Sequence, residues 1–533
     1  MDLPPLRLLL TGLFHSIAGF FPLAYHTSVV SIPEQSLRNF TALSYQSHYN
    51  KSLSEDQLNG LWSLTVSTLN IGGLIGACGS YFLIQAGKMN ILLFIYNNFI
   101  ILVGHVLLIL VFPIQSFECL VLGRLFVGLN SGVVTALLGP WLAECCPARY
   151  RGTICSMLNA AYNTALALGF ILSLPQMLGQ ESLLWLMLGW TLLTTLAQMV
   201  LTPLFPDTPK RILLQLQKLD PDYFVTLQQN ADKTTVDAEL VQNGLSEMTY
   251  LTSENEEEIM NSCSDLADRF ESGEAKRTYE ALKKSLTIYY GSSKYERRLL
   301  EEFLAEMKEA GQNVQIMELF RNPKLLKVLV LSCCVSTATW LTGDVAVMSF
   351  TVSILLQTSD QSIAIANSAT IAIGCSGVVT GILSIYLADK WGRRPLLISG
   401  LWICVLSILF CLIFSLDVVS LRIPTASFAL RILSLLAFQM GFAFGPGNVS
   451  WFITSELFPT AYRPLGSSIA LTCNWITCTV TAQIFPILYA NPAIREYVFL
   501  FYAIPTALLT VYLMRNLPET NNKTSAEILH SLG

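Results

Sequence analysis

The stretch ECCPARYRG, Glu144–Gly152, recurs in the second half of the chain as ELFPTAYRP, Glu456–Pro464. Both copies follow the pattern E-x-x-P-x-x-Y-R, and both lie between long apolar segments. A motif repeated in corresponding places indicates two halves related by an axis along the membrane normal. The repeat therefore predicts that the two glutamates occupy equivalent positions, and that Arg151 and Arg463 do so as well.

The apolar segments around the repeat indicate a membrane protein. Of the 533 residues, 53% are hydrophobic and 13% are charged, about half the charged fraction of an average soluble protein. Twelve segments have the roughly 20 apolar residues that cross a bilayer as a helix. Because backbone groups in hydrocarbon must bond within their own segment, they predict an all-α bundle. The segments lie near 7–30, 58–84, 91–113, 119–143, 153–177, 183–204, 326–356, 363–388, 395–415, 427–453, 465–490 and 496–514.

These segments divide the chain into four predicted parts. Residues 1–204 and 326–514 form two six-helix halves, residues 205–325 an intracellular loop, and residues 515–533 a cytoplasmic tail. Within the loop, AKRTYEALKKSL and KYERRLLEEFLAEMKEA have apolar residues at helical spacing and predict amphipathic helices. The acidic insert before them is poor in apolar residues, which is typical of a flexible linker; phosphorylation or partner docking is the alternative.

Lysine and arginine placement predicts the orientation in the membrane. The connections after the second, fourth, eighth and tenth segments contain Lys88, Arg149 with Arg151, DKWGRR and Arg463. Because cytoplasmic connections are rich in these residues, we expect those faces and both termini to be cytoplasmic. The first connection, on the opposite face, contains sequons at Asn39 and Asn50. They predict glycosylation and favour the plasma membrane, with unused sequons as the alternative.

Other kinds of chemistry lack a signature in this chain. The five histidines have no metal-ligand spacing, so no metal site is expected. There is neither a phosphate-loop motif nor a nucleophile, base and metal arrangement, so we predict no cofactor and no enzymatic activity. The expected partners are the lipid bilayer and a small-molecule solute, and no nucleic acid. The glycines of GFAFGPGN, residues 441–448, predict a break in a membrane helix.

Motifs at corresponding places along nearly the whole chain support a specific resemblance. They are GRLFVG, AECCPARYRG, FPDTPKRIL, EMKE, MELFRNP, DKWGRRPL, FGPGNVSWFITSELFPTAYRP, Asn474 with Trp475, and PET (Pro518–Thr520). As a set, these motifs resemble the sugar porters of the major facilitator superfamily, especially the facilitative glucose transporters. The resemblance implies a twelve-helix major facilitator fold with an intracellular helical domain.

The resemblance implies that charged residues at the predicted cytoplasmic side form a gate. In that family the network joins the two halves when the cavity opens outward, and ion pairs worth ~1 kcal/mol each leave it breakable. The alternative is that these charges only end the helices at the headgroups. The first half departs from the family, since Lys88 and Met89 stand where two arginines are usual. The implied gating residues are Arg124, Glu144, Arg151, Asp389, Arg393, Arg394, Glu456 and Arg463.

The resemblance also implies a substrate site near the membrane centre, where amides, hydroxyls and an indole hold a sugar. Trp451, Asn474 and Trp475 match the family. Asn159 replaces a sugar-contacting glutamine and shares a helix face with Asn163, so the pair either lines the cavity or bonds between helices. Because each unmade buried hydrogen bond costs about 1 kcal/mol or more, we expect poor recognition of glucose itself. The positions that have lost a family polar contact are Thr339, Trp340, Val345, Gly377 and Ala443.

Asp344 is unusual within an apolar segment. A carboxylate inside a membrane helix is costly and by default indicates a functional site facing the cavity. We therefore include Asp344, together with Thr339 and Trp340, in the predicted substrate site, as a proton carrier or a substrate ligand. The alternative is a hydrated, inert residue near the outer mouth.

Together these features predict passive, alternating-access transport of a hexose or related sugar-like solute. One alternative is proton-coupled symport, which requires a buried carboxylate such as Asp344 whose protonation follows substrate binding. A second alternative is a nutrient sensor that binds solute without transporting it. The missing amides favour a sensor, whereas the retained gate motifs argue against it.

Overall fold

A computed structural model describes most of the chain. The described residues are 4–85, 91–146, 148–219, 273–290, 316–356, 362–416, 422, 424–459, 462–491, 493–520, 523 and 525–531. Within these residues, 12 helical segments are long and apolar enough to cross a membrane. The predicted all-α, twelve-span architecture is therefore confirmed.

The N-terminal half contains five continuous spans and a sixth built from short pieces. The sixth span is interrupted at Trp190 and Thr191 between two short α-helices, each flanked by a 3₁₀ turn. The elements are α1 (Leu6–Ser28), α3 (Glu55–Gln85), α4 (Ile91–Ile114), α5 (Phe117–Cys145), α6 (Ala148–Leu172), η1 (Glu181–Leu183), α7 (Leu184–Gly189), α8 (Leu192–Leu201) and η2 (Thr202–Leu204).

The C-terminal half contains two broken spans. The seventh breaks at Gly343, whose φ of 84° lies in the left-handed region that glycine adopts without steric cost. The tenth breaks at Gly445, as predicted, because Pro446 has no N–H to continue the preceding helix. The elements are α15 (Pro323–Leu341), α16 (Asp344–Ser349), α17 (Thr351–Leu356), α18 (Ile363–Trp391), α19 (Arg393–Ser415), α21 (Pro424–Phe444), α22 (Pro446–Leu457), α23 (Arg463–Ala490), η3 (Arg495–Tyr497) and α24 (Val498–Asn516).

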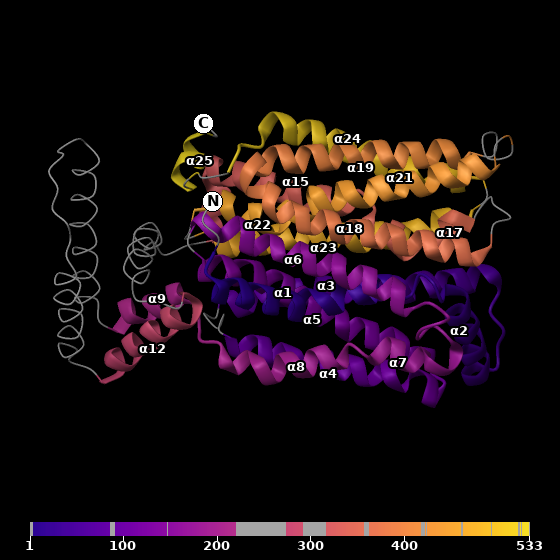
Figure 1. The fold of residues 1–533 in the computed structure, drawn as a ribbon, viewed down its shortest axis with the longest axis horizontal. Helices are drawn as coiled ribbons and strands as arrows, with labels where there is room; N and C mark the ends of the chain where they lie inside the picture. The colour runs from indigo at the N-terminus through magenta and orange to yellow at the C-terminus, as the bar shows by residue number, and fades with distance from the viewer. Residues whose placement is uncertain are drawn as a thin grey trace.

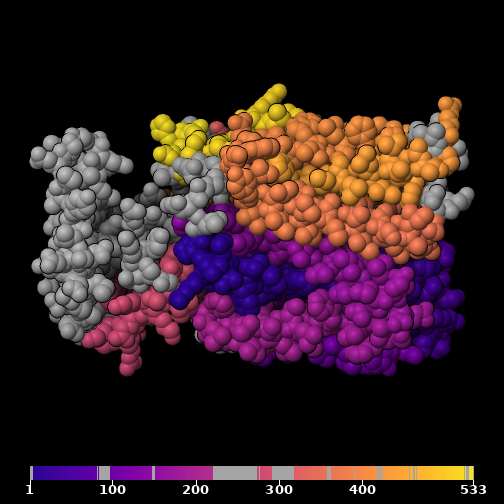
Figure 2. All heavy atoms as spheres, viewed as in Figure 1, coloured from indigo at the N-terminus to yellow at the C-terminus, as the bar shows by residue number. Residues whose placement is uncertain are grey.

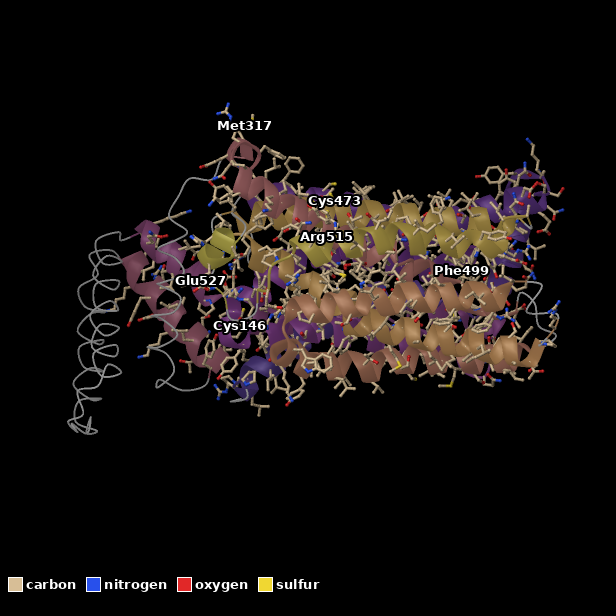
Figure 3. All side chains as sticks on the ribbon, turned by 90° about the horizontal axis from the view of Figure 1, so that it is seen from above. Cys146, Met317, Cys473, Phe499, Arg515 and Glu527 are labelled. Atoms are coloured by element: carbon tan, nitrogen blue, oxygen red, sulfur yellow. The ribbon has the colours of Figure 1, made fainter. Side chains whose placement is uncertain are left out.

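The spans lie side by side and give the bundle two distinct ends (Figure 1). We call one the loop end, because α9 (Pro209–Leu219), α12 (Gly273–Tyr290), α25 (Ser525–Ser531) and both termini lie there. The other is the α2 end, named after α2 (Glu34–Tyr49). Figure 3 shows the bundle from above, with Cys146 and Glu527 toward the loop end and Phe499 toward the α2 end. A further short helix, α14 (Ile316–Arg321), precedes α15.

At the loop end, α9 and α12 pack against each other. The Tyr289 hydroxyl donates to the Pro206 carbonyl oxygen (2.6 Å) and the Ser285 hydroxyl to that of Asp207 (2.8 Å), which joins α12 to the end of the sixth span. The first predicted amphipathic helix, residues 275–286, lies within α12. The second, residues 294–310, and most of the acidic insert lie outside the described residues.

The sequence analysis did not predict α2. Leu37, Thr41 and Ser44 are buried on one face of this helix at i, i+4 and i+7 spacing. The Ser44 hydroxyl also donates to the Gln115 carbonyl oxygen (2.7 Å) in the connection between α4 and α5. The amphipathic signal is therefore present, but it is short and weakly apolar beside the adjacent membrane segments.

Candidate functional site

The predicted substrate residues meet at the interface between the two halves. There α6 packs on α18 and α3 on α23, and Figure 2 shows the two halves meeting along the bundle. At the α2 end, the Ser349 hydroxyl donates to the Thr27 carbonyl oxygen (3.2 Å) and the Ser353 hydroxyl to the Glu34 carboxylate (2.6 Å). Residues 344–356 therefore close the interface at this end, and we call them the α2-end gate.

A small cavity lies in the loop-end half of the interface. Its lining includes Thr135 of α5, Ser336 of α15, Trp451 of α22 and Asn474 of α23. Its volume is about 20 Å³, enough for about one water molecule. Because a hexose needs far more space, this cavity does not hold one in the present conformation.

Three of the predicted substrate residues meet beside this cavity. The Trp340 indole N–H donates to Asn474 Oδ1 (2.6 Å), and the Trp340 and Trp451 ring centroids are 6.3 Å apart. Trp451 also contacts Phe20 of α1 edge to face, at 4.9 Å between ring centroids. Trp340 thus belongs to an aromatic cluster, and its indole N–H is bonded to the amide oxygen of Asn474.

Trp475 contacts the opposite half. Its indole N–H donates to Thr135 Oγ1 (3.1 Å) on α5. Its ring packs directly on Gly73 of α3, where a side chain would overlap the indole. Trp475 therefore joins the halves in this conformation and lies next to the Asn474 cluster rather than within it.

Asn159 also bonds across the interface. Its Nδ2 donates to the Ala443 carbonyl oxygen (2.7 Å), and its Oδ1 accepts from Asn163 Nδ2 (2.8 Å). Asn163 Oδ1 in turn accepts from Gln439 Nε2 (2.9 Å) on α21. The sequence left two roles open for this asparagine pair, lining the cavity or bonding between helices. In this conformation the pair bonds between helices. Gln439 was not among the predicted site residues, although an amide within an apolar segment is itself a signal of interhelical bonding.

Thr339 and Asp344 complete the predicted set. The Thr339 hydroxyl donates to the Val335 carbonyl oxygen of its own helix (3.0 Å), so it does not reach the cluster. Asp344 is 0% exposed and begins α16 directly after the Gly343 break. The alternative of a hydrated residue at an outer mouth is therefore wrong for this conformation, because the closed gate excludes solvent from the carboxyl group.

At the loop end, the repeated glutamates have equivalent partners. The Thr208 hydroxyl donates to Glu144 Oε2 (3.1 Å), and the Thr520 hydroxyl donates to Glu456 Oε2 (2.6 Å). In each half, 64 residues separate the two partners. The threonines belong to Pro-Asp-Thr at 206–208 and Pro-Glu-Thr at 518–520. The structure thus adds a second pair of equivalent motifs, which their spacing from the octet would have identified.

A second carboxylate organises the start of α19. Glu519 accepts hydrogen bonds from the backbone N–H groups of Arg393 (2.9 Å) and Arg394 (3.1 Å). Arg393 Nε also lies 3.7 Å from Glu456 Oε2. Arg394 Nη2 donates to the Met514 carbonyl oxygen (2.6 Å) of α24. These contacts lie within the C-terminal half, while Arg393 and Glu456 also lie near Cys155 of α6 in the other half.

One predicted pair does reach across the interface at the loop end. Arg463 lies near enough to Glu144 to interact with it electrostatically, as do Lys210 and Arg211. Arg151 lies beside Cys146 and Cys155 at the start of α6. The side chain of Asp389 lies outside the described residues.

Arg124 is a correction to the predicted gate. It is 1% exposed, and its guanidinium donates to the carbonyl oxygens of Thr65 (2.9 Å), His26 (2.9 Å) and Val66 (3.1 Å). All four residues belong to the N-terminal half. Since α5 begins at the α2 end, its ~1.5 Å rise per residue places Arg124 about 30 Å from Glu144. Arg124 therefore ties α1, α3 and α5 together and is not part of a loop-end network.

The two sequon asparagines lie at the α2 end. Asn39 is exposed on α2, and Asn50 is exposed directly after that helix with a φ of 51°. Both are on the opposite side of the bundle from α9 and α12 (Figure 1). Their positions are compatible with modification, which remains a prediction.

Replacement of Glu519 by alanine is expected to lower the free energy of unfolding by about 3 kcal/mol, since hydrogen bonds to charged groups contribute roughly 1.5–3 kcal/mol each. The backbone N–H groups of Arg393 and Arg394 would lose their acceptor. Glu519→Gln, which retains one oxygen acceptor, should lose less. The thermal midpoint of the purified protein measures the effect, and an unchanged midpoint in Glu519→Ala would contradict this role.

Two six-helix halves around a polar interface define a transporter of the major facilitator class. The family model described as "Sugar (and other) transporter" matches residues 12–269 and 266–531. Because these matches cover most of the chain, the protein belongs to this family.

Comparisons with individual proteins agree with this membership. Facilitated glucose transporter member 4 of Bos taurus is 27% identical over 536 residues, covering 98% of this chain and 90% of the relative. Member 1 of Gallus gallus is 24% identical over 519 residues, covering 97% and 91%. The solved proton:xylose symporter XylE bound to 6-bromo-6-deoxy-D-glucose gives a TM-score of 0.72 at 17% identity, covering 98% and 99%. At that identity, the structural likeness supports the fold alone.

Proposed function

We propose that this protein is a facilitative transporter that moves a hexose or a related sugar-like solute across a membrane by alternating access. The observation that carries the proposal is the polar interface between the halves. It is closed at the α2 end by hydroxyl hydrogen bonds and retains a small cavity toward the loop end. An interface of this kind separates at one end while the other stays packed, because no single contact is strong.

The solute site lies around Trp340, Trp451 and Asn474. The two indoles provide flat apolar surfaces for a sugar ring, and the Asn474 amide provides directional hydrogen bonds once it is released from Trp340. Asn159 and Thr339 lie at the edges of this region. Trp475 holds α23 against α5 through its hydrogen bond to Thr135. Since several amides usual in glucose transporters are replaced, the preferred solute differs from glucose in its hydroxyl pattern or polarity.

We also propose an orientation, which rests on the lysine and arginine placement in the sequence. The loop end faces the cytoplasm, with α9, α12 and α14 as the intracellular helical domain and both termini on that side. In this proposal the α2 end faces outward, Asn39 and Asn50 are glycosylated, and the protein resides in the plasma membrane. Glu144, Arg463 and the Arg393–Glu456 pair regulate opening at the loop end, without any catalysed reaction.

Uptake of labelled hexoses and polyols by the purified protein in proteoliposomes tests the proposal. We expect at least one solute to equilibrate across the bilayer without an imposed proton gradient, faster than in protein-free vesicles. The matched control is the same preparation with the interface blocked by an engineered crosslink at the α2 end. Absence of flux for every solute in the panel, from protein shown to be folded, would contradict facilitative transport of this class.

A further inference from the structure

Asp344 is a buried carboxyl group that lies beside the hydroxyl of Tyr162 in the other half. It is 0% exposed, and neither carboxylate oxygen has a partner in hydrogen-bonding geometry among the described residues. The hydroxyl of Tyr162, on α6 of the other half, lies close to the carboxyl group and is the donor nearest to bonding with it. An ionised carboxylate here would be strongly disfavoured, because a single hydroxyl donor does not replace its hydration shell.

The neighbouring elements provide no charge to balance the carboxylate. Among the described residues, the titratable groups near it are Tyr162 on α6, Cys404 on α19 and Cys478 on α23, all neutral in their ordinary form. On α1, which also packs against α16, the Tyr25 hydroxyl donates to Met187 (2.7 Å) and His26 Nε2 is bonded to Thr191 (3.1 Å), both in their own half. The remaining way to neutralise the carboxylate in this conformation is to bind a proton.

The position of the carboxyl group links that proton to the conformational change. Asp344 is the first residue of the α2-end gate and follows Gly343, whose left-handed backbone separates the gate from α15. Its interaction with Tyr162 crosses the same interface that the Ser349–Thr27 hydrogen bond closes. When the gate leaves α1, water from the α2 end would reach the carboxyl group.

We propose that Asp344 is a proton-binding site, and that its protonation permits the α2-end gate to close. In the open gate, water hydrates the ionised carboxylate. On closing, the carboxylate takes a proton from hydronium, leaving a neutral carboxylic acid and a water molecule. On opening, the acid returns this proton to water. The inference rests on the proposed function only in requiring that the gate opens and closes.

Glu34, which accepts the Ser353 hydrogen bond, is a second buried acid at the α2-end gate. Burial raises the pKa of the Glu34 carboxyl, and its bond with Ser353 and its proximity to Arg38 offset part of that rise. The protonation state of Glu34 can therefore also change the pH dependence of the gate. An experiment on Asp344 must therefore separate the two acids.

Hydrogen exchange measured by mass spectrometry on the full-length protein, without any solute, tests the proposal. After correction for intrinsic exchange rates, peptides covering residues 344–356 should exchange roughly tenfold faster near pH 9 than near pH 6, since one unit of pKa difference corresponds to a tenfold change. Asp344→Asn, a neutral amide of the same shape, should remain protected at both values. Glu34→Gln should retain most of the pH dependence.

Asp56→Asn is the matched control, because Asp56 is an exposed acid on α3 near the same end; it should behave as the wild type does. Equal corrected protection of the wild type at both pH values would overturn the proposal, even if the Asp344 variant did not fold. So would an Asp344→Asn protein with the wild-type pH dependence, or loss of that dependence in Glu34→Gln alone. Because no solute is present, these outcomes are independent of whether uptake is observed.

Discussion

Replacing Gly73 with alanine is expected to reduce solute uptake by at least about tenfold, since overpacking of a filled interface typically costs 1–3 kcal/mol. A Cβ atom at this position would lie 2.1 Å from the Trp475 ring. The indole cannot move away freely, because its N–H is bonded to Thr135 on α5. The contact joins the two halves. The added Cβ atom therefore raises the free energy of the conformation in which the halves are packed together, and lowers its population.

Gly79 on the same helix provides the matched control, because a Cβ there would meet nothing within 4 Å. Both alanines add the same atom and the same helix propensity, so the difference between the variants isolates the contact with Trp475. Initial uptake rates in proteoliposomes and thermal midpoints in detergent measure it. If Gly73→Ala transports at the rate of Gly79→Ala, then the packing of Trp475 on α3 has no part in the cycle.

Arg124→Ala is expected to destabilise the N-terminal half by about 3 kcal/mol or more, because three buried carbonyl groups lose a charged donor and a cavity remains. The carbonyl oxygens of Thr65, Val66 and His26 would be left without this partner. Arg124→Lys should be nearly as damaging, since an ammonium group lacks the planar fork that reaches several acceptors.

The thermal midpoint measures this loss, and Lys51→Ala, at an exposed position of the α2 end, is the control expected to leave it unchanged. The result also distinguishes the two interpretations of Arg124. A structural residue lowers the midpoint without changing reagent access to the loop-end cavity in the folded fraction. A gating residue would change that access while the midpoint stayed near the wild-type value, and this outcome would contradict the structural role.

The twelve spans could be predicted from the sequence because membrane crossing depends on the length and apolarity of each segment alone. The break at Gly445 was also predictable, because glycine and proline act locally. The break at Gly343 was not predicted, since TWLTGDVAVM lacks a proline and the required φ depends on how α16 packs against α1 and α23.

The candidate site could be predicted only in part. Trp340, Trp451 and Asn474 do lie together, but their hydrogen bonds to one another depend on the closed conformation, which no sequence pattern specifies. Arg124 was assigned to the wrong end of the bundle. The family motif that contains it does not show in which direction the fourth span crosses the membrane. The partnership of Thr208 with Glu144 was missed, although the internal repeat contains it.

The most direct test of alternating access is to lock the α2 end and measure flux. Glu34 and Ser353 face each other across the halves, with 2.6 Å between the carboxylate and hydroxyl oxygens. Cysteines at these two positions, in a variant in which the 13 native cysteines are replaced, can be joined by a short, reducible bifunctional thiol reagent. For a solute identified in the uptake panel, the account predicts that flux stops when the link forms and returns after reduction. Flux that continues at the unlinked rate after complete crosslinking would contradict it.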